Sequence, residues 1–160
     1  TSTGKDDWET PEWLFNQLND EFKFTLDPCC THETAKCRKH YTKAENGLTQ
    51  DWAGETVFCN PPYSRRTKTN PGQIAWVKKC AAEGAKPETT VVALLPARTD
   101  TELFHRYIYG QAEIRFLRGR VSFLDSGKET GKPLFGSMIC NGEGEEKMLN
   151  KIVLMGRLVR

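Results

Sequence analysis

The sequence lacks any long hydrophobic segment. No apolar run approaches the roughly 18 residues that a membrane-spanning helix needs, and the mean hydropathy is −0.61. The chain also opens without the charged, apolar and small-residue pattern of a secretory leader. These absences exclude a transmembrane helix and lead us to expect a soluble, cytoplasmic protein.

Internal repeats and low-complexity tracts are also absent. The length of 160 residues fits one ordinary domain and leaves no room for a second sizeable one. We therefore expect a single domain over residues 6–142 and treat residues 1–5 and 143–160 as termini without a predicted structure.

Regularly spaced cysteines are missing as well. The six cysteines do not follow the spacing of secreted disulfide-rich domains, so we expect free thiols in a reducing compartment. One cluster offers thiolate and imidazole ligands but lacks the paired C-x-x-C spacing of zinc sites. It consists of Cys29, Cys30, His32, Cys37 and His40. We interpret these cysteines as structural and expect no metal ion.

A strong excess of charge of one sign is not present either. The net charge is only +2, which by itself does not indicate a nucleic-acid binder. Residues 64–79 nevertheless contain five basic residues and no acid: Arg65, Arg66, Lys68, Lys78 and Lys79. This run either follows a phosphate backbone or forms a solvated loop and helix face, and charge alone does not separate the two.

Helical and strand-like segments alternate along the chain, which favours an α/β fold with a mostly parallel sheet. Thr10 is expected to cap a helix that begins at Pro11 and presents an apolar face to Phe22. We expect further helices over 73–84 and 99–109. Strands are expected over 24–26, 57–59, 90–95, 113–117, 121–123 and 137–140.

Two connections near the C-terminus also follow from the sequence. Strands 113–117 and 121–123 are expected to form a hairpin around the turn Arg118-Gly119-Arg120. Residues 125–136, which are rich in glycine and lysine, are expected to form a mobile loop.

The segment Asn60-Pro61-Pro62-Tyr63 carries the strongest chemical signal. It follows directly after the predicted strand 57–59, and in open α/β sheets ligands bind just beyond the carboxyl ends of strands. A Pro-Pro turn without a chemical role is the alternative interpretation. The position at the end of a strand favours a binding or catalytic segment.

These residue types suit the methylation of an aromatic amine such as the exocyclic amine of adenine. The lone pair of that amine is delocalised into the ring and must be localised before it attacks. The Asn60 amide oxygen and the Pro61 carbonyl can each accept one amine hydrogen and thereby aim the lone pair at a methyl donor. Proline fixes φ and adds no competing N–H donor, and Tyr63 offers a ring for stacking on a flipped base.

Several segments, in this order, resemble the phage-associated DNA N6-adenine methyltransferases, the Dam-like family. The resemblance extends over about residues 6–140. Its segments are Trp8-Glu9-Thr10-Pro11, Phe24-Thr25-Leu26-Asp27-Pro28-Cys29, Ala35-Lys36-Cys37, Gly47-Leu48 with Asp51-Trp52, Asn60-Pro61-Pro62-Tyr63, Leu95-Pro96-Ala97-Arg98-Thr99-Asp100 and Glu113-Ile114-Arg115-Phe116-Leu117-Arg118-Gly119-Arg120.

The resemblance implies a compact Rossmann-like methyltransferase sandwich that uses S-adenosylmethionine. It also implies a phage- or prophage-encoded enzyme that methylates adenine N6 in double-stranded DNA after base flipping, as in restriction-modification. Catalytic roles are implied for Asn60, Pro61, Pro62 and Tyr63. Contacts to the cofactor are implied for Trp8, Thr10, Pro11, Asp27 and Pro28.

The sequence departs from the wider class of methyltransferases in two ways. Cys29-Cys30-Thr31 replaces the usual glycine-rich turn after the first strand, and only 33 residues separate Asp27 from Asn60. The elements between the first strand and the strand before Asn60 are therefore expected to be shortened. Asp51 is a candidate for holding the ribose and adenine of the cofactor, and a surface role is the alternative.

Six basic residues are candidates for contacting DNA: Arg65, Arg66, Lys68, Arg98, Arg118 and Arg120. Arg98 follows a buried strand at the expected ligand edge. Alternating strand faces put Arg118 and Arg120 on one side, from which they reach phosphates or a guanine edge. Solvated charge is the alternative for each residue. Without a separate recognition domain, these loops are compatible with a short target site or with little specificity.

Two rival functions remain open at this level. One is a methyltransferase that acts on RNA or on a protein glutamine, and the other is a catalytically silent DNA-binding relative. The basic run favours nucleic acid over protein, and the intact Asn60 and Tyr63 favour an enzyme. We expect a monomer or a weak dimer.

Overall fold

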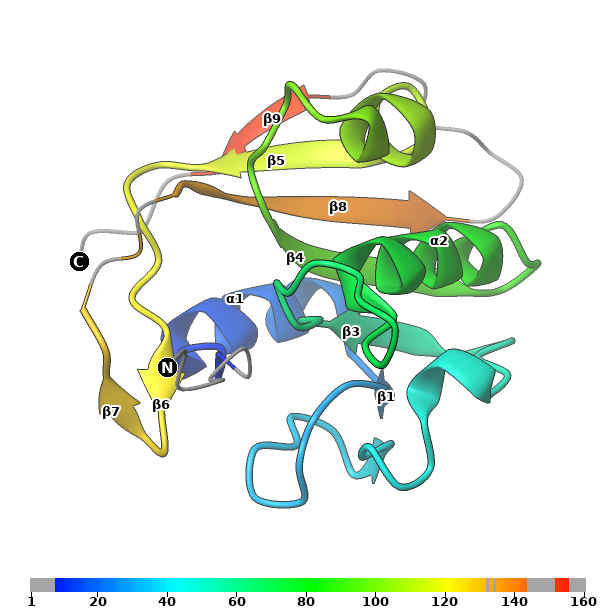
Figure 1. The fold of residues 1–160 in the computed structure, drawn as a ribbon, viewed down its shortest axis with the longest axis horizontal. Coiled ribbons are helices and arrows are strands. Elements are labelled where there is room, and N and C mark those ends of the chain that lie inside the picture. The colour runs from blue at the N-terminus through cyan, green and yellow to red at the C-terminus, as the bar shows by residue number, and fades with distance from the viewer. Residues whose placement is uncertain (1–7, 132, 134, 144–151, 156–160) are drawn as a thin grey trace.

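The computed structural model describes residues 8–131, 133, 135–143 and 152–155 (Figure 1). The elements in chain order are α1 (Glu12–Phe22), β1 (Leu26–Asp27), β2 (Lys39–His40), the 3₁₀ turn η1 (Gly47–Thr49), β3 (Thr56–Cys59), α2 (Gly72–Gly84), β4 (Thr90–Pro96), the π-helical turn η2 (Phe104–Ile108), β5 (Glu113–Leu117), β6 (Leu124–Asp125), β7 (Lys128–Glu129), β8 (Ser137–Glu143) and β9 (Ile152–Met155).

Seven of these strands form one sheet in the order β2-β1-β3-β4-β8-β5-β9. Four of its pairings are parallel, and β8 alone runs against its neighbours β4 and β5. Figure 1 shows β5 and β8 pointing in opposite directions. The expectation of an α/β fold with a mostly parallel sheet is therefore confirmed.

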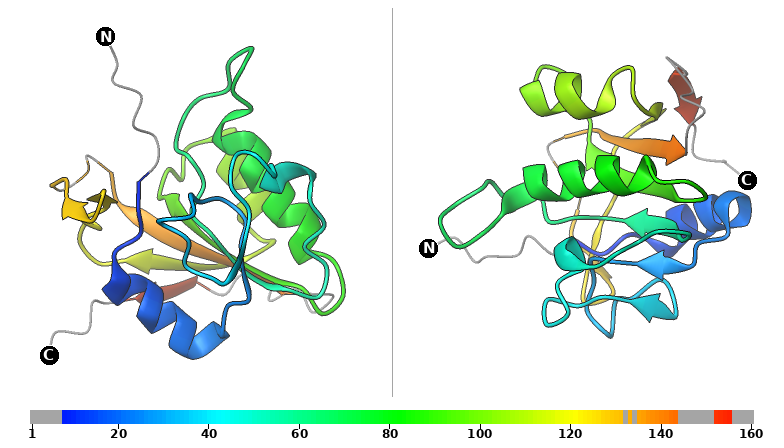
Figure 2. Two further views of the ribbon diagram at one scale, coloured as in Figure 1. Left: turned by 90° about the horizontal axis from the view of Figure 1, so that it is seen from below. Right: turned by 90° about the vertical axis from the view of Figure 1, so that its right-hand side faces the viewer.

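Helices cover both faces of the sheet (Figures 1 and 2). The central strand β4 has apolar side chains on both of these faces. Val92 and Leu94 pack with Leu14 and Leu18 of α1 on one face. Their neighbours Val91, Ala93 and Leu95 belong to clusters on the other face, which α2 and η2 cover. Because successive side chains of a strand point to opposite faces, a continuous apolar run becomes a strand buried on both sides.

The first helix forms as its apolar spacing predicts, but its cap is different. Its buried residues are Leu14, Phe15 and Leu18. They form the apolar face of the helix, which packs against the sheet. Pro11 occupies the N-cap position, and no side chain caps the helix. The expectation that Thr10 is the N-cap is therefore wrong, and its hydroxyl has another partner.

The expected hairpin around Arg118-Gly119-Arg120 is also wrong. Strand β5 pairs with β8 and β9, and residues 121–123 form no strand. Val121 and Phe123 are instead buried in the core between α1 and the sheet (the α1-side core), with 2% and 1% of their surface exposed. These apolar residues fill the core without joining a backbone ladder.

The segment expected as a mobile loop contains the hairpin. Strands β6 and β7 are joined through Ser126 and Gly127, whose φ values are 52° and 78°. A two-residue hairpin turn of this kind requires positive φ at both central positions, which glycine adopts without strain. A backbone bridge between Glu9 and Leu124 ties this hairpin to the N-terminal segment.

Two other boundaries differ from expectation. The first strand is Leu26–Asp27 instead of 24–26, and the helix expected over 99–109 narrows to a short helical stretch around η2. Thr101 accepts the Phe104 amide hydrogen there at 3.3 Å. Strand β9 lies beyond the predicted domain limit of residue 142.

None of the described helices is long and apolar enough to span a membrane.

Glu83 anchors the C-terminal end of α2 to the start of β3. Its carboxylate accepts hydrogen bonds from Lys79 Nζ at 2.6 Å and the Trp52 amide at 3.1 Å, and Lys86 Nζ lies 2.8 Å away. Burial by itself would raise the pKa of Glu83, but these three partners outweigh it and hold the pKa below its usual value. The ionised carboxylate therefore stabilises the fold.

We predict that Glu83→Gln lowers the free energy of unfolding at pH 7 by about 2 kcal/mol, since charged hydrogen bonds are lost. Because the folded pKa is depressed, the wild-type advantage is complete above the ordinary pKa of 4.5 and disappears as the pH falls through the lower folded value. Urea denaturation at pH 7 and pH 3 measures both effects. The matched control Glu102→Gln removes an exposed partner of Arg106 and should leave stability unchanged. A constant Glu83→Gln effect at both pH values would contradict this account.

Candidate functional site

The segment Asn60–Tyr63 leaves the sheet at the carboxyl end of β3. The parallel neighbours of β3 end beside it, β1 at Asp27 and β4 at Pro96. The carboxyl ends of parallel strands are where open α/β sheets bind ligands. The fold therefore brings together, at one edge, the residues that follow three adjacent strands.

The side-chain amide of Asn60 is held in one orientation. Its Nδ2 donates to the Trp8 carbonyl oxygen at 2.6 Å and to Thr10 Oγ1 at 3.0 Å. A backbone carbonyl only accepts hydrogen bonds, so the amide nitrogen must be the atom that faces it. The oxygen Oδ1 is consequently turned away from the N-terminal segment and is presented as an acceptor.

Tyr63 contacts that oxygen. Its hydroxyl lies 3.1 Å from Asn60 Oδ1 and 3.2 Å from the Leu94 carbonyl oxygen, and its single proton serves one acceptor at a time. Burial raises the pKa of the Tyr63 hydroxyl, so the group remains a protonated donor. The ring meets those of Phe123 and Phe135 at 84° and 79°, so neither phenylalanine is stacked parallel on it.

The two prolines supply an acceptor without a competing donor. Pro61 is buried and Pro62 half-buried, and neither has a backbone N–H. Among the described residues, none donates a hydrogen bond to the Pro61 carbonyl. A free carbonyl therefore follows directly after the oriented amide of Asn60.

Asp27, at the end of β1, is buried and shapes the next loop. Its two carboxylate oxygens accept the amide hydrogens of Cys29 at 3.3 Å and Lys36 at 3.0 Å. Burial raises the pKa of Asp27, and these two hydrogen bonds oppose the rise. Pro28 then meets Gly47 so closely that a Cβ on Gly47 would lie 2.1 Å from the Pro28 carbonyl oxygen. Only glycine fits there, and this contact fixes the loop beside the site.

Asp51 is not brought to this edge. It precedes the amino end of β3, where its carboxylate accepts hydrogen bonds from Lys86 Nζ at 2.9 Å and the Ala53 amide at 3.0 Å. Lys86 follows α2 and precedes β4. The structure therefore gives Asp51 the surface role that the sequence left as the alternative.

Comparisons with known proteins identify the family of the chain. Residues 1–141 match the family described as DNA N-6-adenine-methyltransferase (Dam). The DNA N-6-adenine-methyltransferase of Haemophilus phage HP1 (strain HP1c1) is 33% identical over 131 residues, which cover 80% of this chain and 70% of the relative. The chain belongs to the DNA N-6-adenine-methyltransferase (Dam) family.

A second relative is shorter. The Escherichia coli (strain K12) protein named "Putative methyltransferase YfdM" is 37% identical over 65 residues, which cover 36% of this chain and 71% of the relative. The resemblance seen in the sequence is thus confirmed, and the chain is a DNA adenine-N6 methyltransferase.

Basic side chains of the methyltransferase surround the edge that carries Asn60. Arg65, Arg66 and Lys68 are exposed in the loop between β3 and α2. Hydrogen bonds from Gln73 N to Ser64 O and from Thr67 N to Asn70 O close this loop on itself. Its cations are therefore presented from an ordered segment.

The other basic candidates follow the next strands. Arg98 comes after β4 and places its guanidinium 5.7 Å from the centre of the Phe135 ring. Arg118 and Arg120 come after β5 and are exposed, and Arg120 donates to the Pro133 carbonyl oxygen at 3.0 Å. Arg115 differs, because Glu21 and Glu113 neutralise it and it lies over the Phe22 ring.

Sequence reasoning missed the aromatic neighbours of Tyr63. Phe123 was expected in a strand, and Phe135 in a mobile loop. The Ala97 amide donates to the Gly136 carbonyl at 2.8 Å, which holds Phe135 at the end of β4. A lone aromatic residue in a segment rich in glycine and lysine was the available signal.

The cysteine and histidine cluster makes local contacts. Cys30 Sγ lies 3.7 Å from the carbonyl oxygens of Asp27 and Tyr41, and His32 Nδ1 lies 2.9 Å from His40 Nε2. In the described part of the chain, no three histidine, cysteine or acidic side chains are grouped as metal ligands.

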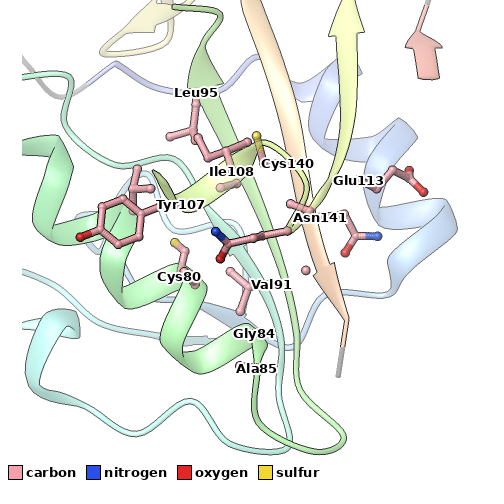
Figure 3. A pocket seen from close by; sticks show the side chains of 16 residues that line it. Cys80, Gly84, Ala85, Val91, Leu95, Tyr107, Ile108, Glu113, Cys140 and Asn141 are labelled. Atoms are coloured by element: carbon pink, nitrogen blue, oxygen red, sulfur yellow. The ribbon is translucent and has the colours of Figure 1, made fainter. Parts of the chain in front are cut away.

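A cavity of about 140 Å³ lies elsewhere in the methyltransferase (Figure 3). It is lined by residues of α2, η2 and strands β4 and β8, among them Cys80, Tyr107, Ile108 and Cys140. Residues 60–63 are not among its lining residues. The cavity is therefore separate from the edge that carries Asn60.

Proposed function

We propose that the methyltransferase transfers a methyl group from S-adenosylmethionine to N6 of a flipped adenine in double-stranded DNA, at Asn60–Tyr63. The observation that carries this proposal is the fixed Asn60 amide. Its nitrogen is engaged by the Trp8 carbonyl and Thr10 Oγ1, so Oδ1 remains to accept, and the following Pro61 carbonyl has no donor among the residues that the structure describes. Two acceptors on consecutive residues match in number the two hydrogens of one amine.

The two acceptors together determine the direction of the amine lone pair. When Oδ1 of Asn60 and the Pro61 carbonyl each take one amine hydrogen, the nitrogen becomes tetrahedral and its lone pair points away from the two oxygens. Fixed acceptors accelerate the reaction because no reorganisation is needed during the transfer. Oδ1 has two lone pairs, and the Tyr63 hydroxyl also has the Leu94 carbonyl as an acceptor, so Oδ1 can accept a hydrogen of the incoming amine.

The residues that flank Asn60 fit a positively charged sulfonium donor. The half-buried Trp8 ring, the Pro61 carbonyl and the buried Asp27 are aromatic, neutral or acidic groups, which suit a cation. The charge of Lys36 is paired, because its Nζ lies 3.7 Å from Glu9 and also contacts Glu12. We assign residues 8–11 and 27–28 to holding S-adenosylmethionine, which supplies an electrophilic methyl group when bound.

We assign the DNA contacts to the basic residues of this edge. Arg65, Arg66 and Lys68 lie on one loop, Arg98 follows β4, and Arg118 and Arg120 follow β5. Phosphate contacts by arginine and lysine fix the register of a protein on DNA and supply most of its non-specific affinity. The phage source of the HP1 relative supports a phage or prophage origin for this enzyme.

The function is tested with labelled S-adenosylmethionine and three acceptors: unmodified double-stranded DNA, RNA of the same sequence and a glutamine-containing peptide. We expect label in DNA alone, located at adenine N6 by nuclease digestion, and we expect sequencing to show which adenines are modified. Cofactor binding without transfer would show a catalytically silent relative. Label in RNA or in the peptide would overturn the proposed substrate.

A further inference from the structure

We infer that Thr10 is a positioning residue for the methyl transfer, and that it acts by holding the Asn60 amide through its hydroxyl oxygen. This inference rests on the role proposed for Asn60. The two residues are 50 positions apart in the chain, yet Asn60 Nδ2 lies 3.0 Å from Thr10 Oγ1. The contact joins the residue that precedes the N-cap of α1 to the residue after β3.

The Thr10 hydroxyl is not used by the helix that it precedes. A threonine just before a helix ordinarily accepts an amide hydrogen of the first turn. Here Pro11 is the N-cap and no side chain takes that hydrogen. Thr10 is only 2% exposed, so its oxygen is directed into the protein. The side chain therefore serves Asn60.

Two hydrogen bonds fix the orientation of the Asn60 amide better than one. Nδ2 carries two hydrogens, and the Trp8 carbonyl and Thr10 Oγ1 give each of them an acceptor. Turning the amide over would place Oδ1 against the Trp8 carbonyl, oxygen against oxygen. Without the threonine hydroxyl, one N–H loses its partner and Nδ2 is held by the Trp8 carbonyl alone.

The N-terminal segment is itself fixed by contacts that do not involve Asn60. Glu9 and Leu124 exchange two backbone hydrogen bonds, of 3.0 Å and 2.9 Å. The Trp8 ring lies 6.4 Å from that of Phe123. Thr10 therefore approaches Asn60 from a position that the fold sets independently, which is the requirement for a preorganised site.

The test compares Thr10→Val with Thr10→Ser in the full-length enzyme. Valine keeps the shape and removes the acceptor, whereas serine restores an acceptor. We expect Thr10→Val to lower kcat by about tenfold, because one hydrogen bond and the alignment of Asn60 are lost. The KM for DNA should stay within about twofold, and serine should recover most of the turnover.

Thr89→Val is the matched control for stability. Thr89 is 1% exposed and accepts the Gly54 amide hydrogen at 2.9 Å, at the opposite edge of the sheet. Its loss should lower the melting temperature about as much as Thr10→Val and leave kcat unchanged. A fall in kcat of equal size in both variants would overturn the inference, because it would show a general structural effect.

A double variant separates this inference from the proposed function. In an Asn60→Ala background, Thr10→Val should cause no further loss of turnover, since it acts through Asn60. A further tenfold loss, or a wild-type kcat for Thr10→Val alone, would overturn the positioning role only. Full turnover by Asn60→Ala itself would instead overturn the proposed function.

Discussion

Asn60→Ala should lower kcat by about a hundredfold to a thousandfold, the range found when one preorganised group at a developing charge is removed. The variant loses the amide oxygen that accepts an amine hydrogen, and the Pro61 carbonyl alone does not orient the lone pair. Single-turnover transfer of labelled methyl groups to DNA measures the loss. The Kd for S-adenosylmethionine, measured by calorimetry, should change little.

Two further variants sharpen this prediction. Asn60→Asp keeps the oxygen acceptor but cannot donate to the Trp8 carbonyl or to Thr10 Oγ1, the two partners of Nδ2. We expect it to retain more turnover than Asn60→Ala and less than the wild type. Asn16→Ala, on the exposed surface of α1, is the matched control and should have no effect. Equal turnover in wild type and Asn60→Ala would remove Asn60 from the mechanism.

Tyr63→Ala should reduce kcat/KM by about tenfold to a hundredfold, because stacking of one base on an aromatic ring contributes about 1–3 kcal/mol. Tyr63→Phe keeps the ring and should retain turnover within about threefold. It should lower the free energy of unfolding by about 1 kcal/mol, since Asn60 Oδ1 and the Leu94 carbonyl lose their donor. Steady-state kinetics on DNA and urea denaturation measure the two effects.

The comparison between these two variants decides the role of Tyr63. If the phenylalanine variant loses as much turnover as the alanine variant, the hydroxyl and not the ring carries the effect. If neither variant loses turnover, Tyr63 has no part in base binding.

Much of the fold was predictable because its signals are local. Residues 12–22, 56–59, 72–84 and 90–96 form the expected helix or strand, since apolar spacing fixes both the type of element and its buried face. The position of Asn60 after a buried strand was equally visible. The family resemblance, carried by short motifs in a fixed order, supplied the activity.

The sequence did not show which backbone segments pair. The apolar residues Val121 and Phe123 suggested a strand. They are instead buried in the α1-side core, and their backbone pairs with no strand. The antiparallel direction of β8 and its place between β4 and β5 depend on long-range pairing. Periodicity within one segment carries no information on its neighbours.

The site was predictable in its chemistry and less so in its supports. The residue types of Asn60 and Pro61 indicated two acceptors, whereas the atoms that orient Asn60 come from residues 8 and 10, about fifty positions away. The sequence predicted Thr10 as the helix N-cap, because capping preferences consider only the residue type and its position next to a helix. They contain no information on contacts to residues far away in the chain. For Asp51 the sequence left a cofactor contact and a surface role open, and its hydrogen bonds with Lys86 Nζ and the Ala53 amide became visible only in the structure.

The most direct test of the account is a crystal structure of the enzyme with its DNA and a non-reactive analogue of S-adenosylmethionine. We predict that the target adenine N6 lies about 3 Å from both Asn60 Oδ1 and the Pro61 carbonyl oxygen, with Asn60 Nδ2 still bound to the Trp8 carbonyl. An adenine held elsewhere, or an Asn60 amide turned so that Nδ2 faces the base, would contradict it.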